Sequence, residues 1–361
     1  MRITRRILLL VLGVQLLIAG LAMGQSRREI NFPDILGYKT LKCDLHMHTV
    51  FSDGLVWPTM RVDEAWREGL DVISITDHIE YQPHKKDIPT NHNRPYDIVR
   101  GRAREKNILL IRGAEITRNT PPGHFNAIFL QDVNPLDTKE LTDAMKAADQ
   151  QGAFIFWNHP GWKPEHKGWF EVHTKLYDNG YMNGIEVCNG VSYYPEAHQW
   201  AIEKNLTMMG NSDIHQPVIT DERTAEDHRT LTLVFAQEKS LASIKEALEN
   251  RRTIVWYKNQ LIGRRQFLEA LVKSALQVSK PHLRQGDYVW FEVTNNCEVD
   301  LKIRKVEGDG PATAVLPANT TTIIKTKVDK QKTEMECSYV ITNCLIAPGK
   351  GLPVSGTIPL E

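Results

Sequence analysis

The chain has 361 residues, which is long enough for two domains with sizeable cores. Lysine plus arginine and aspartate plus glutamate are equal at 44 each, which gives a formal net charge of zero. This balance argues against partners such as long nucleic acid or an anionic membrane surface, which are recognised through an excess of positive charge.

The N-terminus has the three parts of a secretory signal peptide. Three arginines within the first six residues precede an apolar stretch over residues 7–21, and small residues follow at Ala22 and Gly24. We expect residues 1–24 to be removed, which leaves a secreted or periplasmic protein without stable membrane insertion. An uncleaved membrane anchor is the alternative, although the apolar stretch is short for a spanning helix.

Strand-like and helix-like segments alternate between residues 39 and 257. Buried β-branched segments predict strands, and apolar residues at helical spacing predict helices. The predicted strands cover residues 41–46, 70–76, 108–116, 124–130, 153–157, 184–188, 206–210 and 230–236, and the predicted helices cover residues 59–69, 96–107, 138–152, 195–204 and 240–249. Strands separated by helices favour parallel βα units, and thus a doubly wound sheet or a (β/α) barrel within residues 33–262.

The pattern changes in the last hundred residues. Residues 263–284 predict one amphipathic helix that packs on the barrel or between domains, because Phe267, Leu271 and Ala275 share an apolar face. Short strands separated by glycine, proline and asparagine turns then cover residues 285–361, with no helix between them. They predict a small, all-β, sandwich-like domain.

None of the five cysteines forms a CxxC pair, so a zinc site made of thiolates is not expected. Cys43 and Cys188 lie in strand-like apolar segments and are interpreted as buried thiols. A disulfide among Cys297, Cys337 and Cys344 is chemically permitted in an oxidising compartment, and its pairing stays open.

Candidate metal ligands follow most of the predicted barrel strands. Two histidines lie two residues apart at the end of the first strand, so both imidazoles point to the same side. The carboxyl ends of parallel strands meet at one face of a barrel, where such folds place their sites. The complete series in chain order is His46, His48, Asp53, His78, Glu115, His124, His159, Asp213 and His215. Imidazole and carboxylate groups in this arrangement predict a site for divalent cations.

This series resembles the PHP (polymerase and histidinol phosphatase) superfamily. The matching motifs are DLHMHT at residues 44–49, SDG at 52–54, TDH at 76–78, GAEIT at 113–117, NHP at 158–160 and NSDIH at 211–215. The resemblance covers about residues 42–256 and implies a distorted (β/α)7 barrel that holds two to three divalent metal ions. Within the superfamily, the chain looks most like secreted phosphodiesterase-type members with a C-terminal β domain.

The resemblance also implies how the ligands are divided among the ions. The first ion would be held by His46, His48, Glu115 and Asp213. The second would be held by His124, His159 and a bridging Glu115, and the third by Asp53, His78 and His215. Nitrogen and oxygen ligands of this kind suit Zn, Mn and Fe alike.

The implied chemistry is hydrolysis by a metal-activated hydroxide. Cations lower the pKa of bound water and offset the charge on phosphoryl oxygens, so no side-chain nucleophile is needed. Glu115, Asp213 and His215 are the catalytic residues in this scheme, acting through the metal-bound hydroxide. Asp77 is interpreted as a residue that orients a ligand histidine.

Arginines near the motifs are candidates for binding the substrate phosphate. Arg118 lies just after the GAEIT motif, and Arg223 and Arg229 follow the last motif. A solvated surface arginine is the alternative for each of them. Trp162, in the loop after the NHP motif, either offers a stacking surface for an aromatic leaving group or packs in the core.

These features favour a metal-dependent phosphoesterase that acts on a small-molecule phosphoester. Small organic phosphodiesters are the first choice of substrate, and phosphomonoesters are the second. A metal-dependent amidohydrolase or lactonase is an alternative of another class. A non-catalytic protein that binds metal or glycan is a further alternative, against which the complete ligand set argues.

Overall fold

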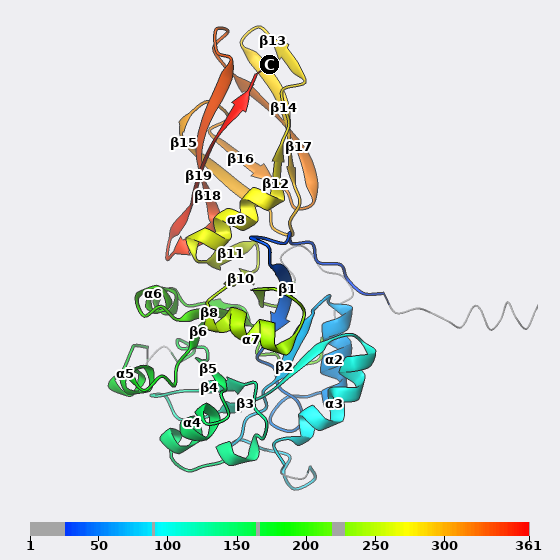
Figure 1. The fold of residues 1–361 in the computed structure, drawn as a ribbon, viewed down its shortest axis with the longest axis vertical. Coiled ribbons are helices and arrows are strands. Elements are labelled where there is room, and N and C mark those ends of the chain that lie inside the picture. The colour runs from blue at the N-terminus through cyan, green and yellow to red at the C-terminus, as the bar shows by residue number, and fades with distance from the viewer. Residues whose placement is uncertain (1–25, 89–90, 164–166, 219–227, 361) are drawn as a thin grey trace, which may run out of the picture.

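The computed structural model describes residues 26–88, 91–163, 167–218 and 228–360. A mixed α/β unit and a smaller all-β unit are stacked along the long axis of the molecule (Figure 1). The expected signal peptide lies outside the described residues. Within the described ranges, no helix combines the length and the apolar character needed to cross a membrane.

One sheet forms the core of the α/β unit. In spatial order its strands are β10 (Thr253–Tyr257), β9 (Leu231–Ala236), β1 (Lys39–Asp44), β2 (Val72–Ile75), β3 (Leu109–Ile116), β4 (Phe125–Ile128), β5 (Phe154–Trp157), β6 (Gly184–Asn189) and β8 (Thr207–Asn211), and the short β7 (Ser192–Tyr193) forms a hairpin with β6. Hydrogen bonds from two threonine hydroxyls connect the two ends of the sheet. Thr253 donates to the Met208 carbonyl and Thr232 to the Gly210 carbonyl, both at 2.8 Å. The sheet is therefore a distorted barrel, as predicted.

β4 and β9 are exceptions to the expected parallel pairing. The pairs β1–β2, β2–β3, β5–β6 and β6–β8 are parallel, whereas β4 runs antiparallel to β3 and β5, and β9 runs antiparallel to β1 and β10. Residues 117–124 connect β3 to β4 without a helix, and so short a connection reverses the chain instead of crossing over the sheet. The start of β4 consequently lies beside the carboxyl ends of the parallel strands.

Helices surround this sheet. They are α2 (Pro58–Arg67), α3 (Arg94–Glu105), the 3-10 turn η1 (Asn134–Leu136), α4 (Leu141–Asp149), α5 (Glu171–Asp178), α6 (Pro195–Glu203) and α7 (Leu241–Glu249). Among the α-helices of the described residues, only α5 has no counterpart among the predicted helices, and the short η1 was not predicted either. Helix α5 has eight residues and buries just His173 and Leu176, so it lacks a periodic apolar face.

The C-terminal unit is a pair of sheets without helices. One sheet contains β12 (Leu276–Val278), β13 (Leu283–Gln285), β14 (Tyr288–Asn295) and β17 (Thr320–Lys327), and the other contains β15 (Leu301–Gly308), β16 (Thr313–Leu316), β18 (Glu334–Ala347) and β19 (Lys350–Pro359). Alternate residues of β14 are buried, namely Val289, Phe291 and Val293, as expected for one inward face. All five cysteines of the chain are free thiols.

The predicted helix over residues 263–284 is shorter in the structure. Helix α8 (Arg265–Ala275) buries the expected apolar face, including Phe267 and Leu271. It ends at Ala275 because the next three residues form β12, which pairs with β14. Strand formation therefore overrides the helical spacing beyond this point.

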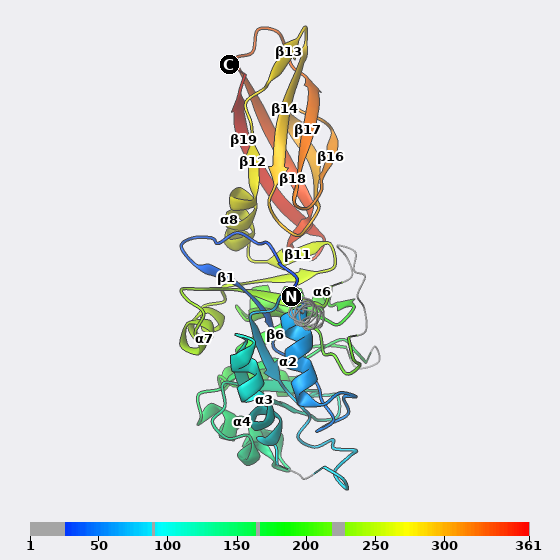
Figure 2. The same ribbon diagram turned by 90° about the vertical axis from the view of Figure 1, so that its right-hand side faces the viewer.

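The two units share a sheet and a core. Strand β11 (Gln260–Gly263), which lies where the two units meet in Figure 2, pairs with β10 of the barrel and with β18 of the C-terminal unit, with Leu261 opposite Cys344. One apolar cluster includes Val62 of α2, Trp256 of β10 and Leu301 of β15. The barrel thus continues into the all-β unit without a free linker.

Candidate metal centre

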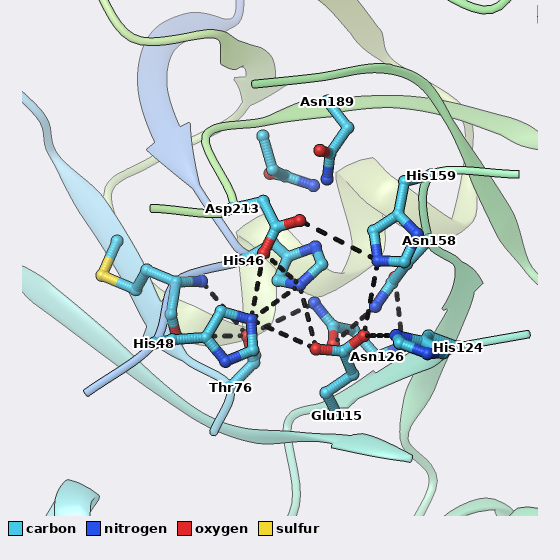
Figure 3. Close-up of polar contacts among 12 residues, drawn as sticks. His46, His48, Thr76, Glu115, His124, Asn126, Asn158, His159, Asn189 and Asp213 are labelled. Carbon is cyan, nitrogen blue, oxygen red and sulfur yellow. Dashed lines mark hydrogen bonds and ion pairs between the residues drawn. The ribbon is translucent and has the colours of Figure 1, made fainter. Parts of the chain in front are cut away.

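All nine predicted ligand residues lie together at one end of the barrel. Six of them converge in Figure 3, from the ends of β1, β3, β5 and β8 and from the start of β4. Their donor atoms fall into four overlapping groups, and within each group all atoms lie within 4.8 Å of one another: His48, Asp53, His78 and His215; His46, His159 and Asp213; His46, His48 and Glu115; and His78, Glu115 and His124. The reversal of β4 explains how His124 reaches this end.

Four of these donor atoms lie close together, two from imidazoles and two from carboxylates. His46 Nε2 and His48 Nε2 are 3.1 Å apart. One oxygen of Glu115 and one of Asp213 each lie 3.2 Å from His46 Nε2 and 3.1 Å from His48 Nε2. Each carboxylate oxygen thus lies beside both imidazole nitrogens, and nitrogen and oxygen donors of this kind are the ligands that divalent zinc takes in proteins. This donor set fits a divalent cation.

Glu115 presents its other oxygen to a second group. Glu115 Oε1 lies 2.7 Å from His124 Nδ1 and 3.6 Å from His159 Nε2. His159 Nε2 lies 3.9 Å from Asp213 Oδ2, whereas the other oxygen of Asp213 lies beside His46 and His48. Glu115 and Asp213 therefore both extend across two groups, as bridging ligands of paired cations do.

A third group lies nearer to the surface. Asp53 Oδ1 is 3.1 Å from His215 Nε2 and 3.6 Å from His78 Nε2. The loop that carries Asp53 approaches His48 closely at Gly54, where a Cβ atom would lie 2.5 Å from the His48 carbonyl carbon. Glycine at this position thus allows Asp53 to reach the group.

Two of the predicted ligands have unusual backbone conformations. His159 has a φ of 28° and Asp213 a φ of 50°, and each lies two residues after the end of its strand, β5 and β8 respectively. Residues other than glycine rarely adopt this region, and it recurs at functional sites where the surroundings impose it. These turns direct both side chains toward the centre of the cluster.

Burial and the charges in the cluster shift the pKa values of its histidines in opposite directions. Burial lowers the pKa of His48, but hydrogen bonds to Asp213 and Glu115 outweigh this effect and raise the pKa to about 9. For His78 burial dominates, and its pKa falls to about 4. Burial would raise the pKa of Asp53, yet the hydrogen bond with His215 and nearby histidine charges lower it to about 2. Because cations compete with protons for these atoms, we expect metal binding to release protons from the site.

Asp77 lies behind the ligands and reaches one of them through Ser52. It accepts hydrogen bonds from the Thr49 amide at 2.6 Å, the Thr49 hydroxyl at 2.7 Å and the Ser52 hydroxyl at 2.8 Å. Ser52 Oγ lies 3.2 Å from His48 Nδ1. This placement agrees with a role in orienting a ligand histidine.

Glu186 is a buried positioning residue that sequence reasoning missed. Its carboxylate accepts from His46 Nδ1 at 2.9 Å and from the His159 amide at 2.8 Å. Asn189 and Asn211 donate to the same carboxylate at 2.8 and 2.9 Å. A charged residue at the centre of the apolar strand GIEVC was the signal that could have identified it.

Arg61 is a second missed residue, and it fixes the backbone of the ligand loops. The side chain is fully buried in α2 and pairs with Glu64 at 2.8 Å. Its guanidinium donates to the carbonyls of His48 and His215 at 2.8 Å, and to those of Ile214 and Gln216 at 3.0 and 2.9 Å. Arg61 thereby ties the first motif to the last one. No sequence signal distinguished it from other helix arginines.

Arg118 lies at the rim of the cluster, in a pocket that His124 also lines. It pairs with Glu80 and donates to the Thr138 carbonyl at 2.8 Å. These contacts hold the guanidinium beside the site, so its predicted role in binding substrate remains a proposal.

Arg229 is not brought to the cluster. Its side chain is buried and pairs with Asp44 at 2.9 Å and with Glu68. The guanidinium therefore links β1 to the end of α2, and its predicted contact with a substrate phosphate is wrong. The third candidate, Arg223, lies outside the described residues.

Comparisons with known proteins cover both units of the chain. A family model for an Ig-like domain matches residues 276–357. A solved structure from Bacteroides vulgatus, of a two-domain protein containing a predicted PHP-like metal-dependent phosphoesterase, matches over 93% of this chain and 100% of that chain. The two share 48% sequence identity, with a TM-score of 0.88. None of the curated proteins compared matches this chain.

Two further solved structures are similar to smaller parts of the chain. One is assigned as a metal-dependent phosphoesterase from Bifidobacterium adolescentis, with 15% identity over 52% of this chain and 92% of that one and a TM-score of 0.41. The other is described as an amidohydrolase from Chromobacterium violaceum, with 15% identity over 49% and 88% and a TM-score of 0.38. Neither likeness is close enough to carry an argument. The full-length match to the Bacteroides vulgatus protein confirms what the motifs indicated: this chain belongs to the family of two-domain PHP-like metal-dependent phosphoesterases with an Ig-like C-terminal domain.

Proposed function

We propose that this protein hydrolyses small organic phosphodiesters, with phosphomonoesters as the second candidate class, and that it holds two to three divalent cations of Zn, Mn or Fe. The close approach of one oxygen each of Glu115 and Asp213 to both His46 Nε2 and His48 Nε2 is the observation that carries this proposal. Such a donor set binds a cation more readily than it serves any purely structural role, because it brings two carboxylates and two imidazoles together in the interior.

The chain's own residues prepare these donor atoms. Glu186 accepts a hydrogen bond from the Nδ1–H group of His46, which leaves Nε2 of that ring with a lone pair for a cation. Glu115 and Asp213 extend across neighbouring groups and set the spacing between them. When divalent cations are bound, they stabilise charge on the phosphoryl oxygens and activate a water molecule.

The surroundings of the cluster support a small substrate. The pocket beside His124 has a volume of about 720 Å³, which suits a small organic molecule. The zero net charge of the chain argues against long nucleic acid. We place the reaction outside the cytoplasm because of the expected signal peptide at residues 1–24.

The test is turnover by the mature chain, purified with Mn, Zn or Fe. An aryl phosphodiester, an aryl phosphomonoester and an aryl carboxyl ester are assayed in parallel. We expect diester turnover that a chelator removes and added cation restores. His46→Ala should lower it by more than about a hundredfold, whereas His282→Ala, an exposed histidine of the C-terminal unit, should not.

Each outcome separates the proposal from an alternative. Turnover of the carboxyl ester alone would favour the amidohydrolase or lactonase class. Absence of phosphoester turnover by protein with a full metal content would contradict the proposal. A monoester rate above the diester rate would reverse the order of the two substrate classes.

A further inference from the structure

The pocket beside His124 contains aromatic and cationic side chains that metal binding does not require. Besides His124 it is lined by Trp162 and by four cationic side chains, Lys85, Arg118, Lys139 and Lys163. Because the pocket includes one of the nine ligand residues, a phosphoester with its phosphate at the cluster would place its organic group here.

Trp162 is a large aromatic side chain held at the surface next to the ligands. It is 47% exposed, and its ring centroid lies 5.7 Å from the ring centroids of both His124 and His159. Lys163 Nζ lies 4.6 Å from the same centroid. An exposed indole between ligand histidines and a lysine offers a flat surface on which an aromatic ring can stack.

The pocket also has an excess of positive charge. Two carboxylates line it, but Glu80 pairs with Arg118 and Asp137 lies 3.5 Å from His92 Nε2. Among the residues that the structure describes, none of the three lysines forms an ion pair with a carboxylate. Their charges are therefore available to an anionic group of a ligand.

We propose that this pocket selects phosphoesters whose organic group is an aromatic ring that carries a further negative charge. The inference rests on the proposed function, because it assumes that the reacting phosphate lies at the metal cluster. Trp162 stacks with the ring, and Lys139 and Lys163 attract the additional anion. A carboxylate or a second phosphate would satisfy the same chemistry.

Binding of phosphonates tests the inference without requiring turnover. Phenylphosphonate, 4-carboxyphenylphosphonate, 4-(aminomethyl)phenylphosphonate and cyclohexylphosphonate are titrated into the metal-loaded protein by calorimetry. We expect the carboxylate to tighten binding by about fivefold to tenfold relative to phenylphosphonate, which corresponds to two screened ion pairs. The aminomethyl group should weaken binding, and high salt should reduce the effect of either charge.

Substitutions measure the contributions of the aromatic ring and of the charge to affinity separately. The double variant Lys139→Gln with Lys163→Gln should remove the advantage of the carboxylate and leave the affinity for phenylphosphonate nearly unchanged. Trp162→Leu should weaken both aromatic ligands by about fivefold to tenfold, without a comparable effect on cyclohexylphosphonate. Lys350→Gln and Tyr288→Leu, exposed residues of the C-terminal unit, are the matched controls.

The result also distinguishes failure of this inference from failure of the proposed function. Equal affinity for the charged and uncharged aromatic ligands, or no binding of either, would overturn the inference even if phosphoesters are hydrolysed. A charge preference that depends on the lysines, in a protein without phosphoester turnover, would support the pocket and contradict the proposed reaction.

Discussion

Substitution of Glu186 by glutamine tests whether the hydrogen bonds behind the ligands set the affinity for metal. The carboxylate accepts four hydrogen bonds, and each of its oxygens serves two donors. Glutamine keeps the shape of the side chain but turns one oxygen into an NH2 group, which cannot accept. If that group faces His46, the imidazole must move its proton to Nε2 and loses the lone pair that points toward the Glu115 and Asp213 carboxylates.

The expected magnitude follows from the bond that is lost. A hydrogen bond to a charged group contributes roughly 1.5–3 kcal/mol, which corresponds to about a tenfold to hundredfold change in affinity. This range agrees with the effect of residues that orient metal-bound histidines in other proteins, about 10–100-fold. We therefore expect Glu186→Gln to bind Mn or Zn about 10–100 times more weakly than the wild-type protein.

Competition calorimetry with a chelator of known affinity measures this change, and elemental analysis after dialysis gives the metal content. Glu196→Gln, an exposed glutamate of α6, is the matched control and should bind metal as the wild type does. A circular dichroism spectrum confirms that each variant is folded. Wild-type affinity in a folded Glu186→Gln protein would refute the reasoning.

Three further substitutions test the supporting structure. Arg61→Met leaves buried carbonyls and a glutamate without their cation, so urea unfolding should show a loss of about 3–5 kcal/mol. Gly54→Ala places a Cβ atom against the His48 carbonyl and should lower turnover by about 10–100-fold, whereas Gly101→Ala, with open space around it, should not. Burial lowers the pKa of His173 to about 4, so the unfolded chain takes up a proton first as the pH falls. Between pH 7 and pH 5, the wild type should therefore lose about 2 kcal/mol more stability than His173→Gln.

Each of these expectations has a result that contradicts it. An Arg61→Met protein within about 1 kcal/mol of the wild type would show that water replaces the guanidinium. Equal turnover of the Gly54 and Gly101 variants would mean that the loop adjusts at no cost. If the free energy of unfolding depended on pH identically in the wild type and the His173 variant, groups other than His173 would cause the loss of stability in acid.

The family, the barrel and the all-β unit could be predicted because their signals are local in the sequence. A histidine or carboxylate at the end of a strand is visible in a motif such as DLHMHT, and the positions of the strands order the motifs around the barrel. The direction of β4 was harder to predict from the sequence, because it depends on the absence of a helix in a short connection. The end of α8 was missed because pairing of β12 with β14 is a contact between segments distant in sequence.

Residues that act through others could not be recognised in the same way. Glu186 and Arg61 are identified by what they touch, and their partners come from loops up to 155 positions away in the chain. Arg229 was assigned a role that it does not have, because its position after the last motif suggested a phosphate contact. Its carboxylate partners, Asp44 and Glu68, are distant from it in the sequence and are brought to it by folding.

The pairing of β11 with β18 has a consequence for how the molecule loses its structure. Because backbone hydrogen bonds and one apolar cluster cross the junction, the Ig-like unit cannot swing as an independent module. We expect a single cooperative melting transition for the whole chain. A barrel truncated before β12 would expose the unpaired edge of β11 and the apolar side of α8, and it would tend to aggregate. The C-terminal unit therefore permanently covers the sheet edge that β11 would otherwise expose.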